Sequence, residues 1–468
     1  MAGSKNVSVR VLLVSYPAQG HINPLFQFGK RLASHHGVGC TLAVARSALG
    51  SSVPPAQPGH GAVPVVAISD GCDLGGYDEV GDVHEYLARL ESAGSRTLDE
   101  LLGSESSRGR PVRVVVYDAF LLWVPRVARQ HGASCAAFFT QACSVNVVYD
   151  HAWRGKVKLP VDKVLAELPG LPKGLQLEPA DCSSFLTQQD SSSTSTYLDL
   201  LLQQCQGLEV ADHVLINSFY ELQTEEAEYM ASRWAARTVG PTLPSAYLDN
   251  RMPDDSSYSF SLHAPMATEC DAWLANRPAR SVVYVSFGSI AAPGPDQLAE
   301  MAQGLYNSGK AFLWVVRAPE TSKLPESFVS KVKESEERGL IVAWSPQLEV
   351  LAHAAVGCFL THCGWNSTME GLGIGVPMVA MPQWSDQPMN AKYIEDIWRV
   401  GVRARPDVGG VVSKDEVERC VREVMDGEKS KEYMENAINW REKTKRAMSE
   451  GGSSDRNIRE FLGKFGWN

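Results

Sequence analysis

The sequence predicts an α/β protein built from doubly wound parallel sheets, and three observations lead to this prediction. Short apolar runs alternate with helical segments along the chain, as in βαβ units. Several runs are apolar at every position, which is typical of strands buried on both faces of a parallel sheet. The 468 residues also exceed the roughly 250–300 at which one hydrophobic core stops growing, so we expect two or three domains.

The first half of the chain carries six predicted strands. They cover residues 10–16, 40–45, 63–69, 112–118, 134–140 and 213–218. Helical segments such as 24–33 and 83–101 lie between them, and Asn23 followed by Pro24 has the order favoured for a helix cap and first helical residue. We therefore predict an N-terminal domain over 1–243.

A change in composition follows this domain. Residues 244–265 are rich in Ser, Asp, Pro and Tyr without periodicity, which indicates a linker or long loop. Six further strands are predicted at 281–287, 312–317, 340–344, 358–362, 377–381 and 402–405. They indicate a second, similar domain over 266–450.

The tail at 451–468 predicts one more helix. Gly451 and Gly452 break the chain, and Ser453 or Ser454 can cap a new helix. One apolar stripe then runs along the helix through Ile458, Phe461, Leu462 and Phe465. Such a stripe needs a surface to cover, so we expect the helix to pack on another part of the protein.

Composition excludes several classes of function. A net charge of −10 argues against nucleic acid and anionic membrane surfaces as partners. No apolar run approaches the ~20 residues that cross a bilayer, and the N-terminus lacks a signal-peptide layout. The ten cysteines form no C-x-x-C pair, which favours a reduced compartment over a zinc or disulfide framework. We therefore expect a cytoplasmic protein.

The stretch from Trp344 to Gln387 is the most informative part of the chain. Its Cys358–His362 strand, tight turn at Gly364 and following helix place backbone N–H groups at the carboxyl end of a sheet, where an anion can bind. The stretch contains no Lys or Arg, so a phosphorylated ligand would be bound by dipoles, by hydroxyls such as that of Ser367, and by His362.

Other side chains of this stretch suit a nucleotide sugar. An indole such as that of Trp344 can stack on a base, while Gln347 and Glu370 can bind the base edge or ribose hydroxyls. Asp386 and Gln387 offer groups suited to sugar hydroxyls. Each residue alone is more often structural, and only their joint order and spacing favour a binding site.

A second candidate site lies in the first half of the chain. His21 follows the first strand in a turn, and Asp118 ends the strand 112–118, so both can reach the same edge of the sheet. Transfer to a hydroxyl needs a base, which an imidazole supplies near neutral pH, and a neighbouring carboxylate would hold its tautomer. The alternative is a pair of structural turn residues.

The Trp344–Gln387 stretch resembles the 44-residue signature of plant secondary product glycosyltransferases without insertion or deletion. The whole chain is similar to plant UDP-glycosyltransferases of glycosyltransferase family 1. This resemblance implies a GT-B fold, with two Rossmann-like domains facing a cleft, the acceptor bound by the first domain and the UDP-sugar by the second. It also implies that the last helix packs back on the N-terminal domain.

The resemblance further implies roles for individual residues. His21 and Asp118 match the catalytic pair, and a terminal Gln at 387 is associated with glucose as the donor sugar. Implied donor-binding residues are Ser289, Trp344, Gln347, His362, Trp365, Asn366, Ser367, Glu370, Asp386 and Gln387. Phe120 and Trp384 match acceptor positions, and Phe185 and Tyr197 lie in the variable 160–197 region.

The implied reaction is an inverting transfer of glucose from UDP-glucose to a hydroxyl or carboxyl of a small phenolic, terpenoid, steroid or carboxylic acid. Without an Asp-x-Asp motif we expect no metal cofactor, and we expect a monomer. Two alternatives stay open: a non-catalytic sugar-nucleotide-binding protein, and a nucleotide-dependent oxidoreductase. The oxidoreductase would need G-x-G-x-x-G after the first strand, where Pro17-Ala-Gln-Gly-His21 stands instead.

Overall fold

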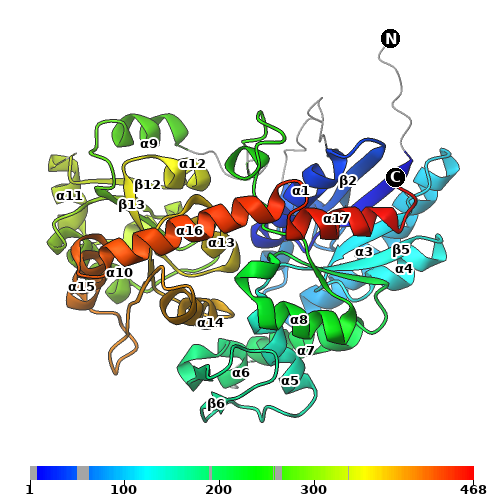
Figure 1. Cartoon of the computed structure of the whole chain (residues 1–468), viewed down its shortest axis with the longest axis horizontal. Helices are drawn as coiled ribbons and strands as arrows, with labels where there is room; N and C mark the ends of the chain where they lie inside the picture. The colour runs from blue at the N-terminus through cyan, green and yellow to red at the C-terminus, as the bar shows by residue number, and fades with distance from the viewer. Residues whose placement is uncertain are drawn as a thin grey trace. The chain divides into compact units, whose positions relative to one another are not determined.

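The computed structural model describes residues 8–49, 63–188, 192–256, 258, 266–335 and 337–467. The chain divides into two compact units: residues 1–262 with 445–468 form the first, and residues 263–444 form the second. Each contains one parallel sheet with helices packed around it (Figure 1). Part of the predicted linker, 257 and 259–265, lies outside the described residues.

The first unit contains a seven-stranded sheet in the order β3-β2-β1-β4-β5-β8-β9, in which every neighbouring pair is parallel. Its strands are β1 Val9–Val14, β2 Val38–Ala45, β3 Val65–Ile68, β4 Val114–Asp118, β5 Ser134–Phe139, β8 His213–Ile216 and β9 Arg237–Thr238. The six predicted strands of this half are confirmed. β9 was not predicted, and neither was the small antiparallel pair of β6 Leu165–Ala166 and β7 Gln176–Leu177.

Helices connect these strands. They are α1 Gln19–Ala33, α2 Arg46–Leu49, α3 Val83–Ser107, α4 Val124–Gln130, α5 Cys143–Trp153, α6 Ser184–Thr187, α7 Ser192–Gly207, α8 Thr224–Trp234 and α17 Ser453–Gly463. The strand order reverses between β1 and β4, which makes the carboxyl ends of these two strands the expected position of a ligand site.

The second unit contains six parallel strands in the order β12-β11-β10-β13-β14-β15. The strands are β10 Val282–Ser286, β11 Ala311–Val315, β12 Gly339–Val342, β13 Val356–Thr361, β14 Met378–Ala380 and β15 Gly401–Arg403, which confirms all six predicted strands of this half. Counted from β10 this is the 3-2-1-4-5-6 order of a Rossmann sheet, and the order reverses between β10 and β13.

The helices of this unit are α9 Ala267–Leu274, α10 Pro295–Asn307, α11 Glu326–Glu334, α12 Gln347–Ala352, α13 Trp365–Ile374, α14 Gln387–Lys392 and α15 Lys414–Asp426. A final long helix, α16 Ser430–Met448, continues into the residues that belong to the first unit. Among the described residues, no helix combines the length and apolar character that a membrane span requires.

Helix α17 packs on the first unit through the apolar stripe seen in the sequence. Ile458 and Leu462 are fully buried, and the ring of Phe461 lies edge-on to His213 of β8. The helix is capped by Gly452, not by Ser453 or Ser454 as predicted. Those two hydroxyls bond elsewhere instead, to Glu221 at 2.7 Å and to the Gly240 carbonyl at 2.6 Å.

Buried ion pairs also hold α17. Arg31 of α1 donates to Asp249 at 2.8 and 3.0 Å and to the Met448 carbonyl, and lies 3.7 Å from Asp455 at the start of α17. Arg251 donates to the same Asp455 at 3.0 Å. Because Arg31 and Asp455 are buried, each charge requires these partners.

We predict that Ile458→Ala lowers the unfolding free energy of the first unit by about 2–5 kcal/mol, because it leaves a cavity in the α17 contact. The matched control is Glu460→Ala on the exposed side of the same helix, which should change stability by less than about 0.5 kcal/mol. Urea unfolding followed by circular dichroism measures both. Equal stability of the two variants would contradict the packing described.

Candidate functional site

His21 and Asp118 lie against each other where the strand order of the first sheet reverses. His21 stands in the first turn of α1, directly after β1, and Asp118 is the last residue of β4. The distance from His21 Nδ1 to Asp118 Oδ2 is 2.7 Å. The backbone N–H of Phe120 donates to Asp118 Oδ1 at 3.0 Å. Because a carboxylate only accepts, Nδ1 carries the ring proton and Nε2 is the basic nitrogen.

The turn before α1 fixes the position of His21. The backbone N–H groups of His21 and Ile22 both donate to the Ala18 carbonyl at 2.9 Å. The helix therefore begins at Gln19, and the prediction that Asn23 caps it and Pro24 starts it is wrong. The prediction relied on the side-chain preferences of helix caps, and these preferences do not reveal backbone hydrogen bonds to the Ala18 carbonyl.

Aromatic rings surround this histidine. The ring of His21 lies 4.9 Å from Phe120 and 5.2 Å from Tyr16, measured between centroids. The hydroxyl of Tyr16 interacts electrostatically with that of Tyr197, whose ring lies 5.6 Å from Phe185. Burial, with these neighbours, raises the pKa of Tyr16 well above its usual value, so its hydroxyl stays protonated.

Of the four predicted acceptor residues, Phe120 therefore lies directly against His21, and Tyr197 and Phe185 are connected to it through Tyr16. Sequence reasoning missed Tyr16. Its signal was available: an aromatic residue directly before the Pro17–Pro24 motif. Thr140, at 3.3 Å from His21 Nδ1, was also missed. The fourth predicted residue, Trp384, belongs to the second unit and is half-buried there.

The second cluster of predicted residues lies where β10 and β13 end. His362 follows β13, and its ring is held closely between two glycines. A Cβ atom added to Gly288 would lie 2.8 Å from this ring, and one added to Gly364 would lie 2.5 Å from its Nε2 atom. Cys363, which stands between His362 and Gly364 in the chain, adopts φ +66°. This left-handed conformation is uncommon in residues other than glycine and is typical of functional turns.

His362 is a neutral side chain. Burial lowers its pKa to about 4, although a hydrogen bond to the Ser286 backbone opposes this shift. Its Nδ1 atom is buried and has no hydrogen-bond partner among the described residues. Near neutral pH the ring can therefore take part in hydrogen bonds but contributes no positive charge.

Helix α13 starts directly beyond this turn. Trp365 is its first residue, Asn366 and Ser367 complete the first turn, and Gly364 precedes it as the cap. The first N–H groups of a helix have no partner within the helix and carry the positive end of its dipole. The structure therefore places the first N–H groups of α13 at the carboxyl end of β13, where the sequence analysis expects an anion to bind.

Three predicted donor residues share a hydrogen-bond network. Gln347 Nε2 donates to Glu370 Oε2 at 2.6 Å and to Ser367 Oγ at 3.0 Å. Gln347 is the first residue of α12, and the other two lie on α13. Trp344 is half-buried in the segment between β12 and α12; β12 ends at Val342, so Trp344 follows the strand instead of ending it.

The remaining predicted residues lie around the start of α14. Gln387 Oε1 accepts from the backbone N–H groups of Gln383 at 2.9 Å and Trp384 at 3.1 Å, which fixes the orientation of its amide. Asp386 accepts from Asn390 at 2.8 Å, and the same Asn390 amide donates to the Cys363 carbonyl at 2.9 Å. Asn390 thus connects the α14 turn to the His362 turn.

Ser289 lies in the loop after β10, next to the glycine that contacts His362. Arg317, which follows β11, donates to the carbonyls of Ser289 and, at 2.9 Å, of Ala291. Sequence reasoning missed Arg317 because it lies outside the signature stretch. Its guanidinium holds the backbone of the Ser289 loop from the side of β11.

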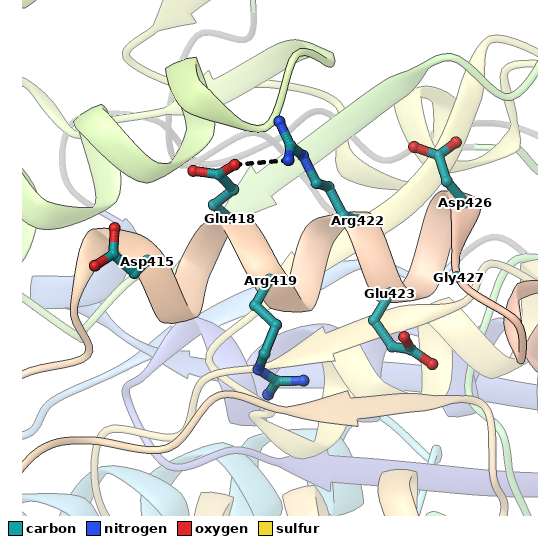
Figure 2. Close-up of a pocket in the computed structure, with 7 residues that line it drawn as sticks. All are labelled: Asp415, Glu418, Arg419, Arg422, Glu423, Asp426 and Gly427. Carbon is teal, nitrogen blue, oxygen red and sulfur yellow. Dashed lines mark ion pairs between the residues drawn. The ribbon is translucent and has the colours of Figure 1, made fainter.

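No group of three or more His, Cys, Asp or Glu side chains in the described parts of the chain could hold a metal ion. A surface hollow over α15 is lined by charged side chains along one helix, where Arg422 pairs with Glu418 (Figure 2). Its lining residues are Asp415, Glu418, Arg419, Arg422, Glu423, Asp426 and Gly427. None of the predicted site residues lines this hollow.

Known proteins are similar to this chain in sequence. A family model described as UDP-glucoronosyl and UDP-glucosyl transferase matches residues 200–441. UDP-glucosyltransferase UGT13248 of Hordeum vulgare is 49% identical over 465 residues, which cover 99% of this chain and 96% of the relative. UDP-glycosyltransferase 79 of Oryza sativa is 47% identical, and the alignment covers 97% of each chain.

Solved structures agree with these relatives. Os79 from Oryza sativa in complex with UDP superposes with a TM-score of 0.89 at 46% identity, covering 97% of this chain and all of the other. Phytolacca americana UGT2 complexed with UDP-2-fluoro-glucose and pterostilbene gives 0.80 at 27% identity over 98% of this chain and all of the other. The chain therefore belongs to the plant UDP-glycosyltransferases of glycosyltransferase family 1 and has their GT-B fold.

Proposed function

We propose that this UDP-glycosyltransferase transfers glucose from UDP-glucose, with inversion, to a hydroxyl of a small hydrophobic plant metabolite. The observation that carries the proposal is the 2.7 Å contact between His21 Nδ1 and Asp118 Oδ2 at the reversal point of the first sheet. A non-catalytic sugar-nucleotide-binding protein would have no need of such a pair. The oxidoreductase alternative is not supported, because the family to which the chain belongs transfers glycosyl groups.

The chemistry follows from the basic Nε2 of His21. It takes the proton of the acceptor hydroxyl while the oxygen attacks the anomeric carbon of the sugar. The bond from that carbon to the phosphate oxygen breaks, and UDP leaves from the opposite face with the bonding electrons. An α-linked donor therefore gives a β-glucoside. Asp118 holds the ring proton of the neutral imidazole on Nδ1, so that Nε2 accepts the proton of the hydroxyl, and it stabilises the imidazolium that forms.

We assign donor binding to the second unit. The α13 N-terminus, Ser367 and Ser289 would stabilise the diphosphate through preorganised dipoles, with His362 as a neutral hydrogen-bonding partner. His362 was expected to take the place of a basic side chain. Because burial keeps its ring uncharged, it can supply a hydrogen bond to the diphosphate but no positive charge. Trp344 would stack on uracil, with Gln347 and Glu370 near the ribose. The sugar would be held by Trp365, Asp386 and Gln387, the last through its Nε2 atom.

The acceptor is proposed to be a flat or apolar small molecule. Phe120, Tyr16 and Tyr197 give the surroundings of His21 an aromatic character. Relatives solved with a trichothecene and with pterostilbene, Os79 and Phytolacca americana UGT2, support a small-molecule acceptor. A hydroxyl is favoured over a carboxyl because only a hydroxyl needs the base that His21 and Asp118 provide.

We predict that His21→Ala lowers kcat/KM for phenol and terpenoid alcohol acceptors by roughly 10²–10⁴-fold, the usual contribution of a general base. Carboxylic acid acceptors, which are already ionised at neutral pH, should lose much less. UDP release and product mass measure both classes with UDP-glucose as donor. The matched control His84→Ala, on the exposed side of α3, should leave both unchanged. An undiminished rate with hydroxyl acceptors would contradict the assignment of the base.

A second prediction concerns the pH dependence of stability. The pKa of His362 is lower in the folded protein, about 4, than the ~6.5 expected after unfolding, so its stabilising contribution is complete above pH 6.5. That contribution is lost as pH falls from 6.5 toward 4. The unfolding free energy should therefore drop between pH 7 and pH 5 by about 1–2 kcal/mol more in the wild type than in His362→Gln. Urea unfolding at both pH values tests this, and parallel losses would contradict it.

A further inference from the structure

A buried tyrosine lies behind the donor-site network of Gln347, Glu370 and Ser367. Tyr284 is on β10, only 1% exposed, and its ring stacks on Phe359 of β13 at a centroid distance of 5.2 Å. Its hydroxyl contacts Gln347 Oε1 at 3.1 Å and Ser345 Oγ at 2.9 Å. Tyr284 lies outside the signature stretch, and no sequence pattern gave it a role.

The direction of each hydrogen bond in this chain of side chains is set by the groups at its ends. Gln347 Oε1 can only accept, so the Tyr284 hydroxyl donates to it, and Ser345 Oγ in turn donates to the tyrosine oxygen. Burial raises the pKa of Tyr284, so the hydroxyl keeps its proton. At the other end the carboxylate of Glu370 requires a donor. One hydrogen-bond chain therefore runs from Ser345 through Tyr284 and Gln347 to Glu370.

This hydrogen-bond chain fixes the orientation of the Gln347 amide. With Oε1 held by Tyr284, both N–H groups of Nε2 point at Glu370 and Ser367, at 2.6 and 3.0 Å. If the amide turned over, its oxygen would face the Glu370 carboxylate. Two acceptors would then face each other, and no hydrogen bond could form between them. Gln347 therefore acts on Glu370 and Ser367, and its own orientation depends on the buried hydroxyl of Tyr284.

We propose that Tyr284, supported by Ser345, is a positioning residue for UDP-glucose binding. Tyr284 fixes the orientation of the Gln347 amide, and that amide in turn fixes the positions of Glu370 and Ser367. The proposal rests on the assignment of these three residues to the donor site. Removing the hydroxyl leaves Gln347 Oε1 without its donor and lets the amide turn, so the Glu370 carboxylate and the Ser367 hydroxyl lose their fixed geometry before the donor arrives.

The experiment is a double-mutant cycle on UDP affinity, measured by calorimetry, together with steady-state kinetics for UDP-glucose. Tyr284→Phe should raise the Kd for UDP and the KM for UDP-glucose about three- to tenfold, the usual range for one buried hydrogen bond. Its kcat and its KM for the acceptor should stay within about twofold, as expected when only uniform donor binding is lost. In a Gln347→Ala background, Tyr284→Phe should have no further effect on UDP affinity.

Two other variants control the cycle. Tyr433→Phe removes the hydroxyl of another buried tyrosine of the second unit, outside this network, and should change none of these constants. Ser345→Ala keeps the Tyr284 ring and should weaken UDP binding in the same direction by a smaller factor. This variant tests the hydrogen-bond chain even if Tyr284→Phe does not fold.

Two results would overturn the inference. One is a Tyr284→Phe variant with wild-type UDP affinity although Gln347→Ala weakens UDP binding. The other is a Tyr284→Phe effect that persists undiminished in the Gln347→Ala background. A wild-type UDP affinity in Gln347→Ala would instead overturn the donor role of Gln347, and with it the part of the proposed function on which the inference rests.

Discussion

The reversal of strand order in each sheet is the constraint on which both candidate sites depend. Where helices leave two adjacent parallel strands toward opposite faces, the carboxyl ends of those strands stay uncovered. In the first sheet these are β1 and β4, which bring His21 to Asp118. In the second they are β10 and β13, which bring the Ser289 loop to the His362 turn. Both candidate sites therefore lie where the strand order of a sheet reverses.

The proposed donor site contains few charged groups. The proposed anion site combines a helix N-terminus, serine hydroxyls and a histidine that burial keeps neutral. The guanidinium that the structure places at the Ser289 loop, that of Arg317, donates to backbone carbonyls. The polar side chains of the proposed donor site hold one another in position through hydrogen bonds, as Tyr284 does for Gln347. A preorganised set of dipoles stabilises charge on leaving UDP without reorganisation during the reaction.

Much of this could be predicted from the sequence because it rests on local pattern. Apolar runs separated by helical segments identified twelve strands, and the polar residues that follow these strands indicated two candidate sites. Features that depend on tertiary contact could not be predicted. The start of α1 is set by bonds to the Ala18 carbonyl, and the cap of α17 changes because two serine hydroxyls find partners far along the chain. Tyr16, Tyr284 and Arg317 are ordinary residues in or beside strands until the fold brings them to the site.

In the proposed mechanism Asp118 makes His21 a base by fixing its tautomer, and the variant Asp118→Asn tests this role. The Phe120 N–H holds the oxygen at Oδ1, so the new amide group would face His21 and force its ring proton onto Nε2. We expect kcat/KM for a phenol acceptor to fall by roughly 10²–10⁴-fold while UDP affinity stays unchanged. Wild-type kcat/KM in Asp118→Asn, in a folded protein that still binds UDP, would show that Asp118 does not set the tautomer of a catalytic His21.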